Sequence, residues 1–97
     1  MTQFVTIHRA PGLSRDELQG NAKPVLEGTH ATFQQMWVDM FNGFIVTVYE
    51  AEDQAALERE FERLGFPWDE VHAVQVQLDH AALEHMIGAT EPTETTG

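Results

Sequence analysis

The stretch YEAEDQAALEREFERLGFPWDEVHAV (residues 49–74) decides the fold of this chain. It consists of the end of one strand, an amphipathic helix, an abrupt stop and a return into another strand. Asp53 is placed to cap the helix, and Gly65 can adopt the left-handed conformation that closes it. One face of the helix carries apolar residues at i, i+4 and i+7, namely Leu57, Phe61 and Leu64. The stretch therefore predicts the second half of a βαββαβ domain.

The first half of the chain has the same order of elements. Residues 3–9 alternate as a strand. Ser14-Arg15-Asp16-Glu17 then has the S-x-x-E form of a capping box, in which hydroxyl and carboxylate satisfy reciprocal backbone donors. Apolar residues follow at helical spacing, but Pro24 lacks a backbone N–H and predicts a kink or an end of the helix nearby.

A β-hairpin is predicted to join the two halves. Residues 31–40 alternate as the second strand, and Phe41-Asn42-Gly43 supplies residues that tolerate the positive φ of a hairpin turn. The third strand, FIVTVYEA (residues 44–51), is the most apolar and is therefore expected at the centre of the sheet. A fourth strand is expected over residues 71–78 and a short helix over residues 79–87.

The order β-α-β-β-α-β predicts an α+β, ferredoxin-like fold, with an antiparallel sheet and two helices on one face. We expect residues 1–87 to form this single domain. Residues 88–97 have no apolar anchor and are expected to be a disordered tail. A chain of 97 residues has a thin core, and pairing with a second copy is a common way to stabilise such a domain.

The composition excludes several classes of function. Sixteen Asp and Glu oppose five Lys and Arg, and a surface with a net charge of −11 repels nucleic-acid phosphates. Because the chain has no cysteine, it has no disulfides, thiolate metal sites or cysteine nucleophiles. We find neither a signal peptide nor the ~20 apolar residues needed to span a membrane. We therefore expect a cytoplasmic protein without nucleic-acid or membrane partners.

One face of the sheet is expected to be left open by the two helices. We assign to the helix side Val5, Ile7, Val46, Val48, Val74 and Val76. The open face then carries Phe4, Thr6, His8, Phe33, Gln35, Trp37, Ile45, Thr47, Tyr49, Ala73 and Gln75. Large aromatic side chains on an open face mark an interface or a ligand pocket. Two such faces packed about a twofold axis would make a homodimer, a dimeric α/β barrel that encloses a cavity.

Three polar side chains on that face are candidates for a ligand site. We expect the first and third strands to run parallel, which would place His8 and Tyr49 at the same end of the sheet, within reach of Gln35. Trp37 and Phe4 would form an apolar floor. His8 is the group that titrates near neutral pH, and in an enzyme it would be the catalytic base. The alternative is that His8 and Tyr49 only line a dimer interface.

The sequence also resembles a small bacterial family of ferredoxin-like domains, some of whose members are nickel-binding proteins. In that family a strand ending in Tyr-Glu-Ala leads to a helix, a Gly-Phe-Pro or Gly-His-Pro corner, and Glu-Val at the last strand. Here these are Tyr49-Glu50-Ala51, Gly65-Phe66-Pro67 and Glu70-Val71, and the resemblance covers about residues 3–78. The same architecture is similar to that of antibiotic-biosynthesis-type monooxygenases and polyketide-cyclase-like proteins, a likeness of fold alone.

The chain departs from the nickel binders at the end of the second helix. Those relatives carry His-Glu-Arg-Ala-Gly-His-Pro, whereas this chain has phenylalanine in place of both histidines, at Phe61 and Phe66. Phenylalanine has no lone pair for a metal, which leaves His8 as the imidazole on which a nickel site could be centred. We therefore expect no cofactor and keep nickel as an alternative.

These observations favour a homodimer that binds a small, partly apolar ligand, oriented by His8, Tyr49 and Gln35. One alternative is an enzyme at the same site, either a cofactor-independent oxygenase or an isomerase or cyclase. Two others are a divalent-metal (nickel) binding protein centred on His8 and a dimerisation module without a ligand. The identity of the ligand cannot be derived from these residues.

Overall fold

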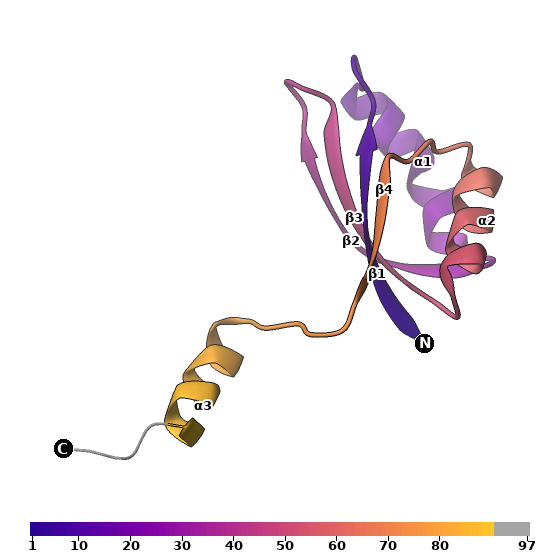
Figure 1. Cartoon of the computed structure of the whole chain (residues 1–97). Helices are drawn as coiled ribbons and strands as arrows, with labels where there is room; N and C mark the ends of the chain where they lie inside the picture. The colour runs from indigo at the N-terminus through magenta and orange to yellow at the C-terminus, as the bar shows by residue number, and fades with distance from the viewer. Residues whose placement is uncertain (91–97) are drawn as a thin grey trace.

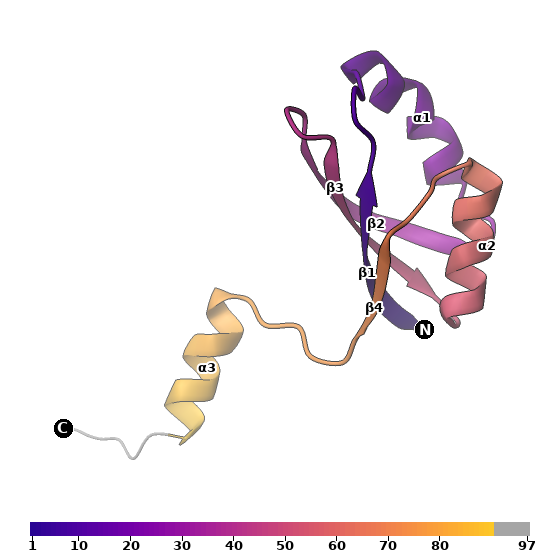
Figure 2. The same cartoon turned by 45° about the horizontal axis from the view of Figure 1, so that its top comes forward.

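The computed structural model describes residues 1–90 as a four-stranded sheet with three helices. Helices α1 and α2 lie on one side of the sheet, and α3 stands apart from it (Figures 1 and 2). The elements in chain order are β1 (Thr2–Arg9), α1 (Arg15–Glu27), β2 (Ala31–Asp39), β3 (Phe44–Ala51), α2 (Gln54–Leu64), β4 (Glu70–Val74) and α3 (His80–Thr90). The predicted α+β, ferredoxin-like order of elements is confirmed.

The strand order is β2-β3-β1-β4, and all three neighbouring pairs are antiparallel. The central position of β3 is confirmed, but the expected parallel pairing of β1 with β3 is wrong. The connection through α1 returns the chain in the direction of β1, so that β2 runs parallel to β1. The hairpin then reverses it, and β3 must run opposite to β1. His8 therefore pairs with Ile45, whereas Tyr49 pairs with Phe4, four residues further along β1.

Local sequence signals place the ends of the elements well. The Ser14 capping box is formed at α1, with Glu17 N donating to Ser14 Oγ and Ser14 N donating to Glu17 Oε1. Asp53 caps α2, and Gly65 ends it at a φ of +72°. These motifs depend on residues three or four apart in the chain, so their formation does not depend on tertiary contacts.

Two predicted boundaries are wrong, those of the last strand and the last helix. The kink or helix end predicted near Pro24 is an end at Glu27, and the carbonyl of Pro24 accepts a hydrogen bond of 2.9 Å from Arg63 Nη2. Strand β4 was predicted to run to residue 78 but ends at Val74, which pairs with Gln3, so that only Thr2 of β1 remains beyond the last pair. The last helix reaches Thr90, and residues 91–97 of the predicted tail lie outside the described residues.

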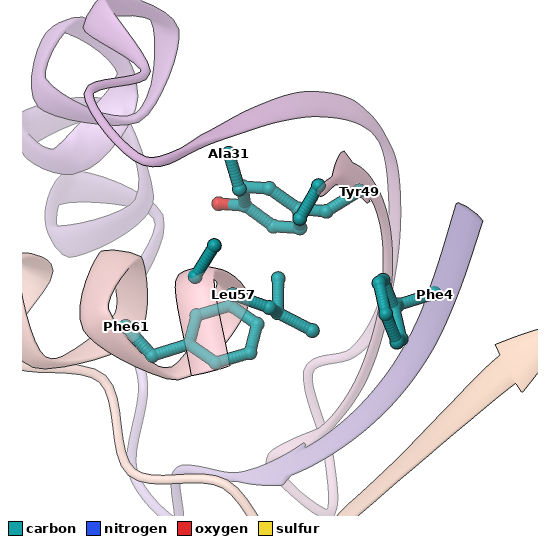
Figure 3. Close-up of a cluster of buried hydrophobic side chains, with 7 residues drawn as sticks. Phe4, Ala31, Tyr49, Leu57 and Phe61 are labelled. Carbon is teal, nitrogen blue, oxygen red and sulfur yellow. The ribbon is translucent and has the colours of Figure 1, made fainter. Parts of the chain in front are cut away.

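The core lies between α2 and the sheet. Figure 3 shows the rings of Phe4, Tyr49 and Phe61 gathered around Leu57. The complete cluster of buried apolar residues is Phe4, Ala31, Tyr49, Ala51, Ala56, Leu57 and Phe61. At about 25 cal/mol per Å² of apolar surface removed from water, this cluster is the main source of stability in the domain. Among residues 1–90, no helix is long and apolar enough to cross a membrane.

Gly43 ties the hairpin to the end of β1 and gives a test of the fold. Its φ is +64°, its carbonyl accepts a 2.7 Å hydrogen bond from Ala10 N, and an added Cβ would lie 2.4 Å from Ala10 O. Gly12 has a φ of +78° but open space around it. In urea unfolding, we expect Gly12→Ala to cost about 1–2 kcal/mol and Gly43→Ala at least about 1 kcal/mol more, because the backbone must also shift. Equal losses would show that the turn accommodates the methyl group.

Candidate functional site

In β1 and β3, the two faces of the sheet are the reverse of those predicted from the sequence. The residues that we expected on the open face of β1 and β3 are buried beneath the helices, namely Phe4, Thr6, His8, Ile45, Thr47 and Tyr49. The residues that we expected beneath the helices form the centre of the open face, where each is half-buried, namely Val5, Ile7, Val46 and Val48. The alternation of side chains along each strand could not show which set faces the helices, because both sets are apolar enough to be buried. The larger rings fill the space over Leu57 and Phe61 of α2.

A bulge in β2 separates the predicted ligand residues into two groups. The register between β2 and β3 shifts between Phe33 and Gln35. Phe33 pairs with Tyr49 on the helix side, whereas Gln35 and Trp37 pair with Val48 and Val46 on the open side. One extra residue reverses which face every later side chain occupies. Gln35 and Trp37 therefore lie on the opposite face of the sheet from His8, Tyr49 and Phe4, and the five predicted residues do not form one site.

His8 is held between two oxygen atoms under the helices. Its Nδ1 lies 2.8 Å from the carbonyl oxygen of Pro67, and its Nε2 lies 2.9 Å from Thr47 Oγ1. A carbonyl oxygen can only accept, so Nδ1 carries the proton and Nε2 accepts from the Thr47 hydroxyl in the neutral ring. The ring of Phe61 packs edge-on against the imidazole, with 4.8 Å between ring centroids.

This environment keeps the imidazole neutral. Burial lowers the pKa of His8 below its ordinary value of 6.5, although the hydrogen bond to Pro67 and the negative charge of Asp69 act in the opposite direction. Asp69 is itself paired with Arg9 at 3.1 Å. His8 is therefore an uncharged hydrogen-bonding group at neutral pH.

Tyr49 belongs to a different part of the interior. Its ring stacks edge-on against Phe33 and Phe61, and its hydroxyl is one of two buried polar groups with no hydrogen-bond partner in the described structure, the other being Thr6 Oγ1. Burial, with the negative charge of Glu60, raises the pKa of Tyr49 to about 12. Phe61 lies between the two predicted ligand residues, so the phenol and the imidazole do not share a site.

A cavity of about 630 Å³ lies between α1 and the sheet, and His8 forms part of its wall. Its apolar lining comes from α1, β2, β3 and the α2–β4 corner, and includes Leu18, Val25, Met36, Val38, Ile45 and Phe66. Thr47 lines it beside His8. This is the size and character of a small-molecule site, which is mostly apolar with a few polar groups. The sequence signal that points to Thr47 is a hydroxyl flanked by two valines in the most apolar strand.

Helix α1, which forms one wall of the cavity, is held near its carboxyl end. Arg63 donates to the carbonyl of Pro24 and, at 2.6 Å, to the buried carboxylate of Glu60, which also accepts from His30 N. Although burial acts to raise it, these hydrogen bonds and the charge of Arg63 hold the pKa of Glu60 below its usual range. Val25 is the buried residue of α1, and Leu18 and Ala22 of the same helix line the cavity.

The residues present do not fit a nickel site. Within residues 1–90, no three His, Asp or Glu side chains are grouped to hold a metal ion. Both ring nitrogens of His8 are engaged by protein oxygens, and Phe61 covers the ring. Phe66, at the second position where the nickel binders carry histidine, lines the same cavity. Of the two positions at which the resemblance implies histidine, Phe61 contacts His8 and Phe66 lines the same cavity, and both present hydrocarbon.

Comparison with known proteins supports the resemblance seen in the sequence. The model of the SCO4226-like family, described as "Nickel responsive protein SCO4226-like", matches residues 4–74. The crystal structure of SCO4226 from Streptomyces coelicolor A3(2) has a TM-score of 0.70 and 29% sequence identity, and the match covers 78% of this chain and 99% of that one. No protein with a curated description matches the chain.

The lowered pKa of His8 predicts a dependence of stability on pH. As the pH falls, the unfolded chain binds a proton at His8 before the folded one does, so stability rises with pH in this range. The contribution of neutral His8 is complete above about pH 6.5 and is lost as the pH falls toward the lowered pKa. We expect the free energy of unfolding in urea to fall more between about pH 7.5 and pH 5.5 in the native chain than in His8→Gln. Parallel declines would contradict the assignment.

Proposed function

The chain belongs to the SCO4226-like family of nickel responsive proteins, and within it we propose that this protein binds a small, partly apolar ligand in the cavity between α1 and the sheet. The observation that carries this proposal is the juxtaposition of a cavity of about 630 Å³ with the His8–Thr47 pair. The site differs from the one predicted on the open face: His8 is retained as its polar group, while Tyr49, Gln35 and Trp37 lie elsewhere.

The polar groups of the cavity indicate the class of ligand. The Thr47 hydroxyl donates a hydrogen bond to His8 Nε2 and keeps acceptor capacity on its oxygen. The N–H at His8 Nδ1 already donates to the carbonyl oxygen of Pro67. A ligand with one hydroxyl or N–H donor on an apolar body therefore matches this part of the wall. Arg9, Glu17 and Asn21 also line the cavity. Arg9 is already paired with Asp69, and the net charge of −11 disfavours an anion.

We propose that the protein acts as a homodimer, joined through its open sheet face into a dimeric α/β barrel. The support is the uncovered apolar surface at the centre of that face, where Val5, Ile7, Val46 and Val48 are only half-buried and Trp37 is 53% exposed. Burying such a surface against its own copy is the simplest way to cover it.

Two earlier alternatives carry less support from this geometry. An acid–base enzyme would need His8 Nε2 free, and it is occupied by Thr47. A nickel-binding role rests on the printed family name, and the residues around His8 do not provide the ligands for it. If this chain responds to nickel, it requires residues other than those grouped near His8.

A pair of matched probes tests the ligand site. We expect 2-naphthol to bind and to stabilise the protein in a thermal melt, and 2-methylnaphthalene to bind about tenfold more weakly, since it lacks the donor for Thr47. Ala22→Phe, which fills the cavity from α1, should abolish binding of both probes. Gln19→Phe, on an exposed position of the same helix outside the cavity, is the control. Binding that survives Ala22→Phe would refute the cavity as the site.

Nickel binding is tested separately on protein without a histidine tag. We expect calorimetric titration with Ni²⁺ to give no binding to the native chain at micromolar concentrations, because Phe61 and Phe66 offer no lone pair. Restoring imidazoles with Phe61→His/Phe66→His should create nickel affinity beside His8. Phe66→His alone spares the buried core and serves as an intermediate variant. Tight Ni²⁺ binding by the native chain that persists in His8→Gln would place a metal site elsewhere.

A further inference from the structure

The imidazole of His8 is fixed at both ring nitrogens, and one of its two partners lines the cavity. The carbonyl oxygen of Pro67 lies 2.8 Å from Nδ1, and the hydroxyl oxygen of Thr47 lies 2.9 Å from Nε2. His8 and Thr47 are only 5% and 1% exposed, so water does not compete for these bonds. Because a carbonyl oxygen only accepts, Nδ1 keeps its proton, and Nε2 is the ring nitrogen whose protonation can change.

The corner that carries the Pro67 carbonyl is anchored on both sides. Before it, Phe66 N donates a 2.9 Å hydrogen bond to the carbonyl of Phe61, which ties the corner to α2. After it, Asp69 N donates a 2.8 Å hydrogen bond to the carbonyl of Ile7, which ties the corner to β1. These two backbone bonds hold in place the carbonyl that orients the imidazole, whichever charge the ring carries.

Both charge states of His8 satisfy the same two partners, but the hydrogen bond to Thr47 runs in opposite directions. In the neutral ring Nε2 accepts from the Thr47 hydroxyl, so the hydroxyl oxygen offers acceptor capacity to the cavity. In the imidazolium Nε2 donates, so the Thr47 oxygen accepts and its own proton can be donated into the cavity. The change requires the rotation of one hydroxyl group and no movement of the backbone.

We infer that His8 sets the class of ligand that the cavity takes: a ligand with an N–H or O–H donor when the imidazole is neutral, and a ligand with a carbonyl-type acceptor when it is protonated. The inference rests on the proposed ligand site and adds the control of that site by protons. Thr47 is the group that contacts the ligand, and His8 acts through it as a positioning residue. Each class of ligand stabilises the charge state to which it binds, so binding of the ligand and of the proton are coupled.

Few charged groups surround the imidazole. Among the described residues that line the cavity, the charged ones are Arg9 of β1 and Glu17 of α1, and the lining from β2, β3 and α2 is uncharged. The negative charge of Asp69, before β4, favours the imidazolium, but Asp69 is paired with Arg9 at 3.1 Å. Burial lowers the pKa of His8 below its ordinary value of 6.5, which places the exchange of ligand class on the acid side of that value.

Three probes of similar shape distinguish the two states of the cavity. Indole carries an N–H donor and no carbonyl acceptor, 1-indanone carries a carbonyl acceptor and no donor, and indane carries neither. In calorimetric titrations at about pH 7.5, we expect indole to bind about fivefold more tightly than indane, and 1-indanone to bind more weakly than indane. The reason is that a carbonyl against the Thr47 oxygen leaves two buried acceptors unpaired. Below the pH at which His8 is half protonated, 1-indanone should bind more tightly than indole.

Nitrogen NMR of the imidazole gives the charge state of His8 in the same samples. Saturating indole should lower the pH at which His8 is half protonated by at least about 0.3 units, and saturating 1-indanone should raise it by a similar amount. An imidazole that stays neutral until the chain unfolds would overturn the inference. A half-protonation pH that neither probe moves would also overturn it.

Three variants assign the effect to the pair of side chains. Thr47→Val keeps the shape of the wall and removes the hydroxyl, so the ratio of indole to 1-indanone affinity should no longer depend on pH. In His8→Gln the amide can donate to Pro67 and accept from Thr47 but takes up no proton, so the preference for indole should remain and its reversal should disappear. Thr6→Val is the matched control, because Thr6 lies opposite Thr47 on β1, is equally buried and is not part of the cavity wall. It should behave as the native chain.

The outcomes separate this inference from the proposed ligand site. If no probe binds, or if binding survives Ala22→Phe, both the site and the inference are refuted. If the probes bind in the cavity but their order of affinity is the same for neutral and protonated His8, the inference is overturned and the site is retained. A pH-dependent order that persists in Thr47→Val would assign the effect to another group, and it would overturn the inference as well.

Discussion

The packing of Phe61 is the constraint on which the two halves of this domain depend. Its ring touches His8 of β1 at 4.8 Å, Tyr49 of β3 at 5.3 Å and Trp68 before β4 at 5.7 Å between centroids. One side chain of α2 thus holds three segments that are distant in sequence. Because it is fully buried against rings from β1 and β3, it also decides which face of the sheet is inside. The imidazole, the phenol and the cavity all take their positions from that choice.

Local chemistry made the element order and most element ends predictable from the sequence. The Ser14 capping box, the Asp53 cap and the closing glycine at Gly65 involve residues close in the chain, and each was predicted at its observed position. Two relations between residues distant in the chain were predicted wrongly: the relative direction of β1 and β3, and the face of these strands that is buried. The direction of β3 relative to β1 could have been predicted from the sequence, although we expected the opposite. One crossover keeps the strand direction and one hairpin reverses it, so β3 must run antiparallel to β1. Which face of each strand is buried could not be predicted, since Val5 and Ile7 are as suitable for burial as Phe4 and Thr6.

The candidate site was predictable only in part for the same reason. His8 was identified as its central group, but the bulge between Phe33 and Gln35 has no signature in the sequence, and it moves Gln35 and Trp37 to the other face. Thr47 was missed as a partner of His8 because their pairing depends on strand register. Phe61 most changes the expected surroundings of His8: where the resemblance to nickel binders implies histidine, its ring packs edge-on against the imidazole and offers no lone pair to a metal. Burial in these surroundings keeps His8 in its neutral form.

The net charge of −11 opposes the association of two copies, and the distribution of that charge limits the effect. The centre of the open face is uncharged, and several of the carboxylates lie on the exposed side of α2, away from that face, at Glu58 and Glu62. At physiological ionic strength the Debye length is about 8 Å, so charges on the far sides of two such domains are largely screened from each other. Burial of apolar surface is not screened, at about 25 cal/mol per Å². Pairing through the valine face and Trp37 is therefore compatible with an acidic chain, and its strength should increase with salt.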